Sequence, residues 1–225
     1  PQLATDWKAT SPTTWTFNLR KDVKFSDGTK MTSEDVVFSI LRAKLPTSDF
    51  KEYISSVSSV KALDDYSIEI ATAEPNPILL NQLSNIFVVS KAWATENFSI
   101  APQNWNASQE TYASVNAMGT GPFKITLREP NTKTVFKKNK KWWGEVEHNL
   151  TSIELLPIAN AATRVAALLS GEIDLVTDAP VQDLGRIGSS TGHKVVSTPQ
   201  MRTIFLGMDQ GCLLYTSPSP RDVSL

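Results

Sequence analysis

Residues 15–41 contain a strand pattern, a tight turn and a helix start in succession, and this order limits the fold more than any other feature of the chain. Residues 15–20 (Trp-Thr-Phe-Asn-Leu-Arg) alternate large apolar and polar side chains, which is typical of a half-buried strand. The Asp-Gly pair at 27–28 favours a turn. A helix is expected from Thr32, because its hydroxyl can cap the first N–H groups and acidic residues follow in the first turn.

The middle of the chain continues this mixture of strand and helix patterns. Residues 57–73 predict two strands around the turn at 64–65, since the second half alternates cleanly. Residues 78–83 predict a short helix, and the apolar run 86–89 predicts a short buried strand. Residues 91–117 are mostly polar, so we expect a long excursion over the surface there.

A second group of strands is expected after this excursion. Residues 119–123 (Gly-Thr-Gly-Pro-Phe) predict a tight turn that leads into a hairpin. The hairpin strands would be 123–128 and 134–138, joined by a turn at 129–131.

The last regular pattern runs strand, helix, strand. Residues 153–156 predict a strand, Asn160 can cap the following helix, and Gly171 is placed to end that helix in a left-handed conformation. Residues 173–176 predict the strand after it. This order resembles a βαβ unit, so the fold class is predicted to be α/β.

Composition limits the function classes. The formal net charge is -1, from 22 basic and 23 acidic residues, so nothing indicates binding to nucleic acid or to an anionic membrane surface. No apolar run approaches the roughly 20 residues of a membrane span. The chain opens on Pro1 without a Met or a basic segment, from which we expect that it starts inside a longer protein.

No catalytic constellation or metal site is predicted, and no cofactor is expected. The turn at Gly119 lacks the Lys-Ser/Thr of a phosphate loop and precedes a strand. Ser58 and Lys61 have the spacing of an acyl-serine motif, but they lie on a predicted strand, where they would not share one helical turn. His148 and His193 are far apart in the sequence and are expected at the surface.

Other residues allow two interpretations. The tryptophans at 142–143 and 105 could stack on a sugar or peptide ligand, or close a hairpin onto a core, and we favour the core. Glu172 and Asp174 could form a carboxylate pair, although a solvated corner is the simpler interpretation.

The end of the chain has a different character. Residues 212–222 match one reading frame of a common transposase sequencing adapter, so the native sequence is expected to end near residue 210 or 211. The single cysteine, Cys212, lies in this segment and is therefore no candidate nucleophile or metal ligand. The absence of any other cysteine suits an oxidising compartment.

Several of these motifs together resemble one protein family. Residues 15–40 resemble the signature block of the family 5 extracellular solute-binding proteins, the peptide and nickel receptors of ABC importers. Residues 119–123 and 139–144 resemble the second hallmark of the family, and 163–175 resemble the third. Residues 202–210 resemble a variant that is common among peptide receptors of the family.

This resemblance implies a periplasmic-binding-protein-like (class II) fold, with two lobes around a cleft, of which the chain would supply most of lobe I. Residues 1–114 would be part of a family-specific subdomain, 115–211 the core of lobe I up to the hinge, and 212–225 a non-native tail. It implies capture of a solute without chemistry, in the periplasm or another extracytoplasmic location. The expected partners are a small peptide and the permease subunits of an ABC transporter, and the protein is expected to be a monomer.

The resemblance also implies where a ligand would be bound. The family lines its cleft from the loop after the first helix, here with Phe50 and Tyr53, from the stretch around Asn85, and from the strand near the hinge, with Met201 and Arg202. A cationic Arg202 could meet a ligand carboxylate. Peptides are the expected ligands, with nickel chelates, opines or oligosaccharides as alternatives, and a hydrolase of unknown type is the alternative from another function class.

Overall fold

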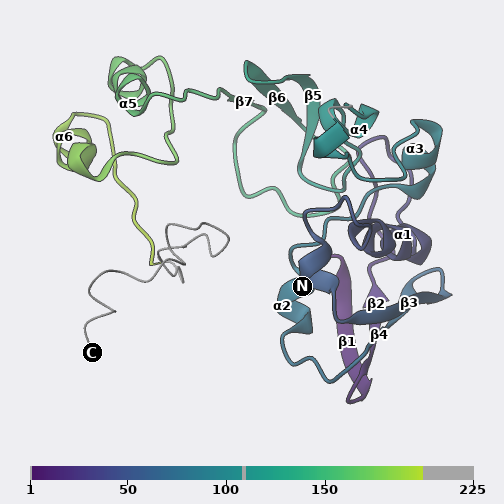
Figure 1. The fold of residues 1–225 in the computed structure, drawn as a ribbon. Helices are drawn as coiled ribbons and strands as arrows, with labels where there is room; N and C mark the ends of the chain where they lie inside the picture. Colours follow the sequence, from purple (N-terminus) through teal and green to yellow (C-terminus); the bar gives the residue numbers. More distant parts are fainter. Residues whose placement is uncertain (1, 108–109, 200–225) are drawn as a thin grey trace, which may run out of the picture. The chain divides into compact units, whose positions relative to one another are not determined.

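The computed structural model describes residues 2–107 and 110–199 (Figure 1). The chain divides into two compact units, Pro1–Pro157 and Ile158–Leu225, and each is described by itself. None of the helices in the described part is long and apolar enough to cross a membrane.

The first unit is built on a four-stranded antiparallel sheet with the order β1-β2-β4-β3. Its strands are β1 (Ala4–Ser11), β2 (Thr14–Leu19), β3 (Val57–Asp64) and β4 (Ser67–Thr72). Phe17 of β2 lies opposite Ile68 of β4, and both side chains are buried. The predicted strands at 15–20 and 57–73 are confirmed, because the alternating pattern places one face of each strand in the core.

Helix α1 (Ser33–Ala43) covers one face of this sheet and begins where the sequence predicted (Figure 1). The Thr32 N–H donates to Asp35 Oδ2 at 2.9 Å, so the first-turn carboxylate satisfies a backbone donor at the helix start. The other carboxylate oxygen accepts from the Lys91 N–H at 2.9 Å. Asp35 therefore ties α1 to a segment far along the chain.

The predicted turn before α1 is also confirmed. Gly28 has φ +99, a conformation that side chains with a Cβ rarely adopt, and the Thr29 N–H donates to Asp27 Oδ1 at 2.8 Å.

One continuous core lies between α1 and the sheet. It includes side chains from β2, α1, β3, β4 and the 3₁₀ helix η1 (Lys51–Ile54), together with Leu79 of α2 (Leu79–Leu83). Its buried members are Phe17, Leu19, Val23, Phe25, Met31, Val36, Ile40, Ile54, Val57, Ile68, Ile70 and Leu79. The short helix expected at 78–83 is thus confirmed as an element that closes this core.

The strand predicted at 86–89 is wrong. These residues have no strand structure, and Phe87 is 74% exposed. The Ser39 hydroxyl of α1 accepts a hydrogen bond from the Val89 N–H at 2.9 Å and lies 3.2 Å from the Val89 carbonyl. A side chain of α1 therefore takes the backbone partners that a neighbouring strand would have supplied.

The polar excursion predicted at 91–117 contains helical turns that the sequence analysis did not predict. They are α3 (Lys91–Glu96), the 3₁₀ helix η2 (Trp105–Ala107) and α4 (Tyr112–Val115). α3 begins with a side-chain cap, because Ser90 Oγ accepts from the Trp93 N–H at 3.2 Å.

A three-stranded antiparallel sheet, β5-β6-β7, completes the first unit. Its strands are β5 (Phe123–Glu129), β6 (Lys133–Lys138) and β7 (Ser152–Leu155), as predicted. Asn139 holds the turn before β5 in place, since its N–H donates to the Pro122 carbonyl at 2.7 Å and its side-chain amide to the Gly121 carbonyl at 3.1 Å.

The second unit contains α5 (Ala161–Ser170), the 3₁₀ helix η3 (Val181–Asp183) and α6 (Leu184–Ser189). Asn160 Oδ1 accepts from the Thr163 N–H at 3.0 Å, and Gly171 has φ +77, so both predicted ends of α5 are confirmed.

The strand predicted at 173–176 is wrong, since these residues have no strand structure and pair with no strand in the described part of the chain. A strand needs a neighbour for its N–H and carbonyl groups. The predicted βαβ unit is therefore not formed, whereas the mixed α/β class is confirmed.

Candidate ligand-binding site

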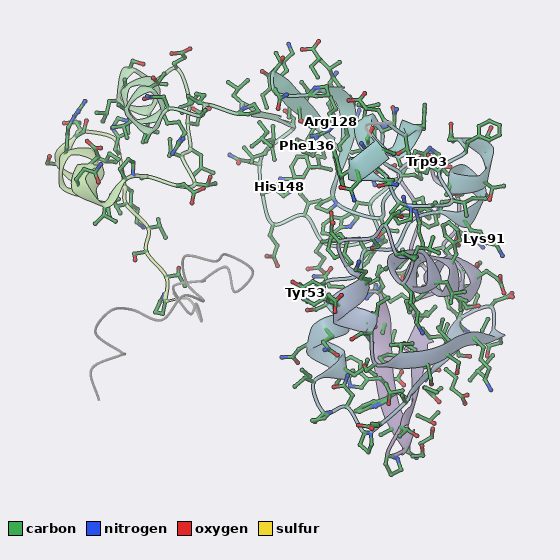
Figure 2. The ribbon with its side chains drawn as sticks, in the orientation of Figure 1. Tyr53, Lys91, Trp93, Arg128, Phe136 and His148 are labelled. Atoms are coloured by element: carbon green, nitrogen blue, oxygen red, sulfur yellow. The ribbon has the colours of Figure 1, made fainter. Side chains whose placement is uncertain are left out.

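Three aromatic side chains gather on the first unit, beside the end of α1. The ring of Phe50 lies 6.3 Å from that of Tyr53 and 6.3 Å from that of Phe87, which it meets edge-on at 84°. Phe50 and Tyr53 are 40% and 42% exposed, and Phe87 is more exposed still. We call Phe50, Tyr53 and Phe87 the aromatic cluster, and Figure 2 shows Tyr53 on the short helix that carries it.

Buried neighbouring residues fix the segments that carry the aromatic cluster. Ile54 is fully buried and anchors the 3₁₀ helix that carries Tyr53. Ser48 is also buried, and its hydroxyl accepts from the Phe50 N–H at 3.2 Å. A small cavity of about 100 Å³ opens beside Phe50 and Phe87, with Arg42 among its lining residues. The rings are thus exposed, while the segments that carry them are anchored by buried residues.

The structure brings together only some of the predicted ligand-binding residues. The rings of Phe50 and Tyr53 lie 6.3 Å apart, and their role in ligand binding stays a prediction. Asn85 is half-buried, and its amide donates to the carbonyls of Asn81 and Gln82 at 3.2 and 3.3 Å, where it caps the end of α2. Met201 and Arg202 lie outside the described residues.

Phe87 is the member of the aromatic cluster that the sequence analysis missed. It lies in an apolar run, and such runs indicate burial. Its flanking residues Ile86 and Val88 are indeed partly buried against the core, whereas Phe87 points outward. Nothing in the sequence distinguishes Phe87 from its apolar neighbours in this run.

The candidate acyl-serine motif is not a catalytic pair. Ser58 and Lys61 lie on the strand β3, so they do not share the helical turn that this motif requires. The Lys61 ammonium instead pairs with Glu69 on the neighbouring strand at 2.9 Å. Among the described residues there is no group of three or more side chains that could hold a metal ion.

The two histidines are less exposed than predicted. His148 stacks on Phe123, with ring centroids 4.8 Å apart, and both its ring nitrogens are buried without a hydrogen-bond partner in the described part of the chain. His193 is half-buried, and its Nε2 lies 3.0 Å from the Leu168 carbonyl. The surface prediction is therefore wrong for the His148 ring nitrogens, which are buried, whereas His193 is only half-buried.

The tryptophans were predicted either to stack on a ligand or to close a hairpin onto a core, and they differ in this respect. Trp143 is half-buried against the core, donates from Nε1 to the Thr120 carbonyl at 3.0 Å, and lies under the guanidinium of Arg20, 4.6 Å from the ring centroid. Trp105 is 67% exposed. Trp143 closes a turn onto the core as predicted, and Trp105 does not.

Comparison with known proteins identifies the family of the chain. Residues 1–223 match the family described as bacterial extracellular solute-binding proteins, family 5 Middle. The chain belongs to this family. Its members bind solutes and are not enzymes, as the sequence resemblance implied. The match runs past Cys212 to residue 223, and the adapter origin of residues 212–225, which are not described, stays a prediction.

Relatives in the family are periplasmic receptors. The periplasmic oligopeptide-binding protein OppA of Escherichia coli K12 is 26% identical over 227 residues, which cover 91% of this chain and 40% of OppA. The periplasmic murein peptide-binding protein MppA of the same strain is 26% identical over 226 residues, again covering 91% of this chain and 40% of the relative. The chain therefore spans about 40% of the length of these relatives.

Solved structures of the family share the fold. AgaA of A. tumefaciens R10, in complex with agropinic acid, is 25% identical with a TM-score of 0.73, over 85% of this chain and 37% of AgaA. DppA of Helicobacter pylori, in complex with the peptide STSA, is 26% identical with a TM-score of 0.66, over 83% of this chain and 39% of DppA. The mixed α/β arrangement of this family 5 chain is thus that of solute-binding proteins.

Proposed function

We propose that this family 5 chain belongs to a receptor that captures peptides outside the cytoplasm and delivers them to the permease of an ABC importer. The observation that carries the proposal is the family match together with the peptide-binding names of its relatives, OppA and MppA. The peptide held by the related DppA structure points to the same ligand class.

The proposed mechanism is capture by closure of two lobes. Residues 1–114 would be a subdomain and 115–211 the core of lobe I, with lobe II supplied by chain beyond this sequence. A ligand that contacts both lobes binds the closed state more tightly than the open state, and this difference in affinity drives closure. Peptides can be held through main-chain hydrogen bonds, which give affinity without strict sequence preference.

The aromatic cluster is the part of the described chain best suited to contact such a ligand. Exposed rings on a rigid base bury a large apolar area with little loss of side-chain freedom. Their faces accept side chains of many kinds, as a receptor for varied peptides requires. Asn85, Met201 and Arg202 remain proposed ligand contacts on the family resemblance alone, and Met201 and Arg202 lie outside the described residues.

Opines are a second candidate ligand class. AgaA is bound to agropinic acid, and MoaA of A. tumefaciens R10, which is 29% identical with a TM-score of 0.67, is bound to mannopinic acid. Nickel chelates and oligosaccharides are two more ligand classes that the screen below should include.

The test is a thermal-shift screen of the full open reading frame that encodes this chain. We expect stabilisation by di- to pentapeptides, and a smaller shift when Phe87 is replaced by Ala. Phe98→Ala is the matched control, because Phe98 is 94% exposed and makes no aromatic contact with the cluster. Stabilisation by opines, nickel chelates or sugars, without any by peptides, would show that the peptide assignment is wrong.

A further inference from the structure

One edge of the four-stranded sheet has no neighbouring strand in the described part of the chain. Strand β1 pairs with β2 only, and its residues 5–11 are exposed (Figure 1). An edge strand presents backbone N–H and carbonyl groups to which another strand can add. The side chains of β1 therefore decide what can pair with it.

The regular part of β1 is short. Its register with β2 shifts between Ala4 and Asp6 and again between Ala9 and Ser11, so residues 6–9 are the stretch that pairs without interruption. Bulges and charged side chains commonly protect a sheet edge from pairing. Here the bulges confine pairing to residues 6–9, and the order of the charges within this stretch decides whether pairing is opposed or favoured.

The two faces of this stretch differ in character. Trp7 lies opposite Phe17 of β2, whose side chain is buried, so Trp7 is on the face toward the core, where it is 39% exposed. Asp6 lies opposite Asn18, whose amide donates to Asp6 Oδ1 at 2.6 Å. Lys8 is on the same outer face as Asp6, because side chains alternate along a strand.

An apolar groove of about 390 Å³ lies on the core face of the sheet, next to β1. Its lining residues come from β1, β2, β4, α1 and α2, among them Leu3, Trp7, Phe17, Leu80 and Leu83. Trp7 belongs to the edge strand, so a strand added to β1 with its apolar face on the same side would cover the exposed part of this ring. Burial of that apolar area would favour the addition.

The charges of Asp6 and Lys8 are not paired within the part of the chain that the structure describes. The Asp6 carboxylate accepts only from neutral groups, the Asn18 amide and the Thr5 hydroxyl, the latter at 2.9 Å. Lys8 makes no ion pair with a described residue. Both charges are therefore open to partners on an added strand.

An antiparallel second copy of β1 can pair in a register that suits both faces. With Trp7 opposite Trp7 of the second copy, Asp6 of each copy lies opposite Lys8 of the other. This register gives two pairs of unlike charges on the outer face and an aromatic pair on the core face. A slip by two residues opposes Asp6 to Asp6 or Lys8 to Lys8, and a slip by one turns the apolar face of one copy to the outer side. The charges thus select one register.

We propose that β1 is a docking surface for a second copy of this chain, joined edge to edge about a two-fold axis at Trp7. Such a contact is isologous, because each copy uses the same residues. It would join the two sheets into one and cover both Trp7 rings. The proposal departs from the monomer expected from the family resemblance, and it does not depend on which ligand the receptor binds.

The test is sedimentation velocity on the product of the full open reading frame. Because only residues 6–9 pair regularly, we expect a reversible dimer with a dissociation constant on the order of 10–100 μM, followed from about 5 to 500 μM protein. Asp6→Lys and Lys8→Asp each oppose like charges at two symmetry-related positions, so each should weaken the dimer about 10- to 100-fold. The double variant Asp6→Lys/Lys8→Asp restores unlike pairs and should recover most of the wild-type affinity.

The matched control is Asp65→Lys, which makes the same change of charge at an exposed position between β3 and β4 and should leave the dimer unchanged. Trp7→Thr tests the core face, and it should weaken the dimer about tenfold through the loss of buried apolar area. Melting temperatures measured alongside show whether each variant keeps the fold.

Three results would overturn the proposal. A monomer at every concentration would mean that β1 is protected, either by its bulges or by chain outside residues 1–225. A dimer that both single charge variants leave unchanged, or one that the double variant fails to restore, would place the contact elsewhere. None of these results bears on the peptide screen, so the proposed function is tested separately.

Discussion

Replacement of Asp35 by Ala should destabilise the first unit more than a typical surface change. The Asp35 carboxylate is buried and accepts from the N–H groups of Thr32 and Lys91, each at 2.9 Å. Without it, two backbone donors lose their acceptors. A buried donor without a partner costs about 1–3 kcal/mol, and since both bonds are only partly enclosed we expect a total loss of about 2–4 kcal/mol.

The assay is urea unfolding followed by tryptophan fluorescence. All 6 tryptophans lie within residues 1–157, so the signal reports on the first unit. With a urea dependence of about 2 kcal/mol per molar, the midpoint should fall by about 1–2 M. Asp35→Asn is the matched control, because its amide keeps one acceptor oxygen, and it should lose about half as much. A loss below about 1 kcal/mol for Asp35→Ala, or equal losses for both variants, would refute the reasoning.

Three further predictions concern the same unit. Leu79→Ala empties a fully buried position and should cost about 2–5 kcal/mol in urea unfolding, whereas a near-neutral result would mean that α2 does not close the core. Gly28→Ala places a Cβ on a residue with φ +99 and should cost about 1–2 kcal/mol of unfolding free energy. The nearby end of the Lys141 side chain can move away from this Cβ, but the turn keeps the backbone in the left-handed region, where a residue with a Cβ is strained. An unchanged urea midpoint would contradict this. Hydrogen bonding from the Ser67 hydroxyl lowers the pKa of Asp64 in the folded state. The ionised Asp64 therefore stabilises the folded state above the unfolded pKa of about 4, and this stabilisation is lost as pH falls through the lower folded pKa. The stability difference between wild type and Ser67→Ala should therefore narrow on acidification from about pH 6 to pH 2, and a widening difference would reverse the assignment.

Most elements of the fold were predictable because local rules fix them. The alternation at 15–20 and the caps at Thr32 and Asn160 each depend on neighbours a few residues away. The failures at 86–89 and 173–176 share one cause. An apolar run shows that a segment is buried or extended, but it does not show whether a strand is available to pair with it.

The candidate site was predictable only through the family resemblance. Nothing in the pattern around Phe50 and Tyr53 distinguishes exposed ligand-binding rings from core aromatics. Phe87 joins them through a contact across the fold, which depends on the path of the chain after α2.

The order β1-β2-β4-β3 has a consequence for how the first unit folds. Its two outer pairs, β1–β2 and β3–β4, are hairpins that close through short turns, whereas the central pair β2–β4 joins residues 14–18 to residues 67–71. Closing that long loop costs more entropy than forming either hairpin. Each hairpin can therefore form early, and the slow step is their docking with α1 between them. Substitutions at the Phe17–Ile68 contact should accordingly slow folding, while changes near the tip of β1–β2 should mainly alter the rate of unfolding.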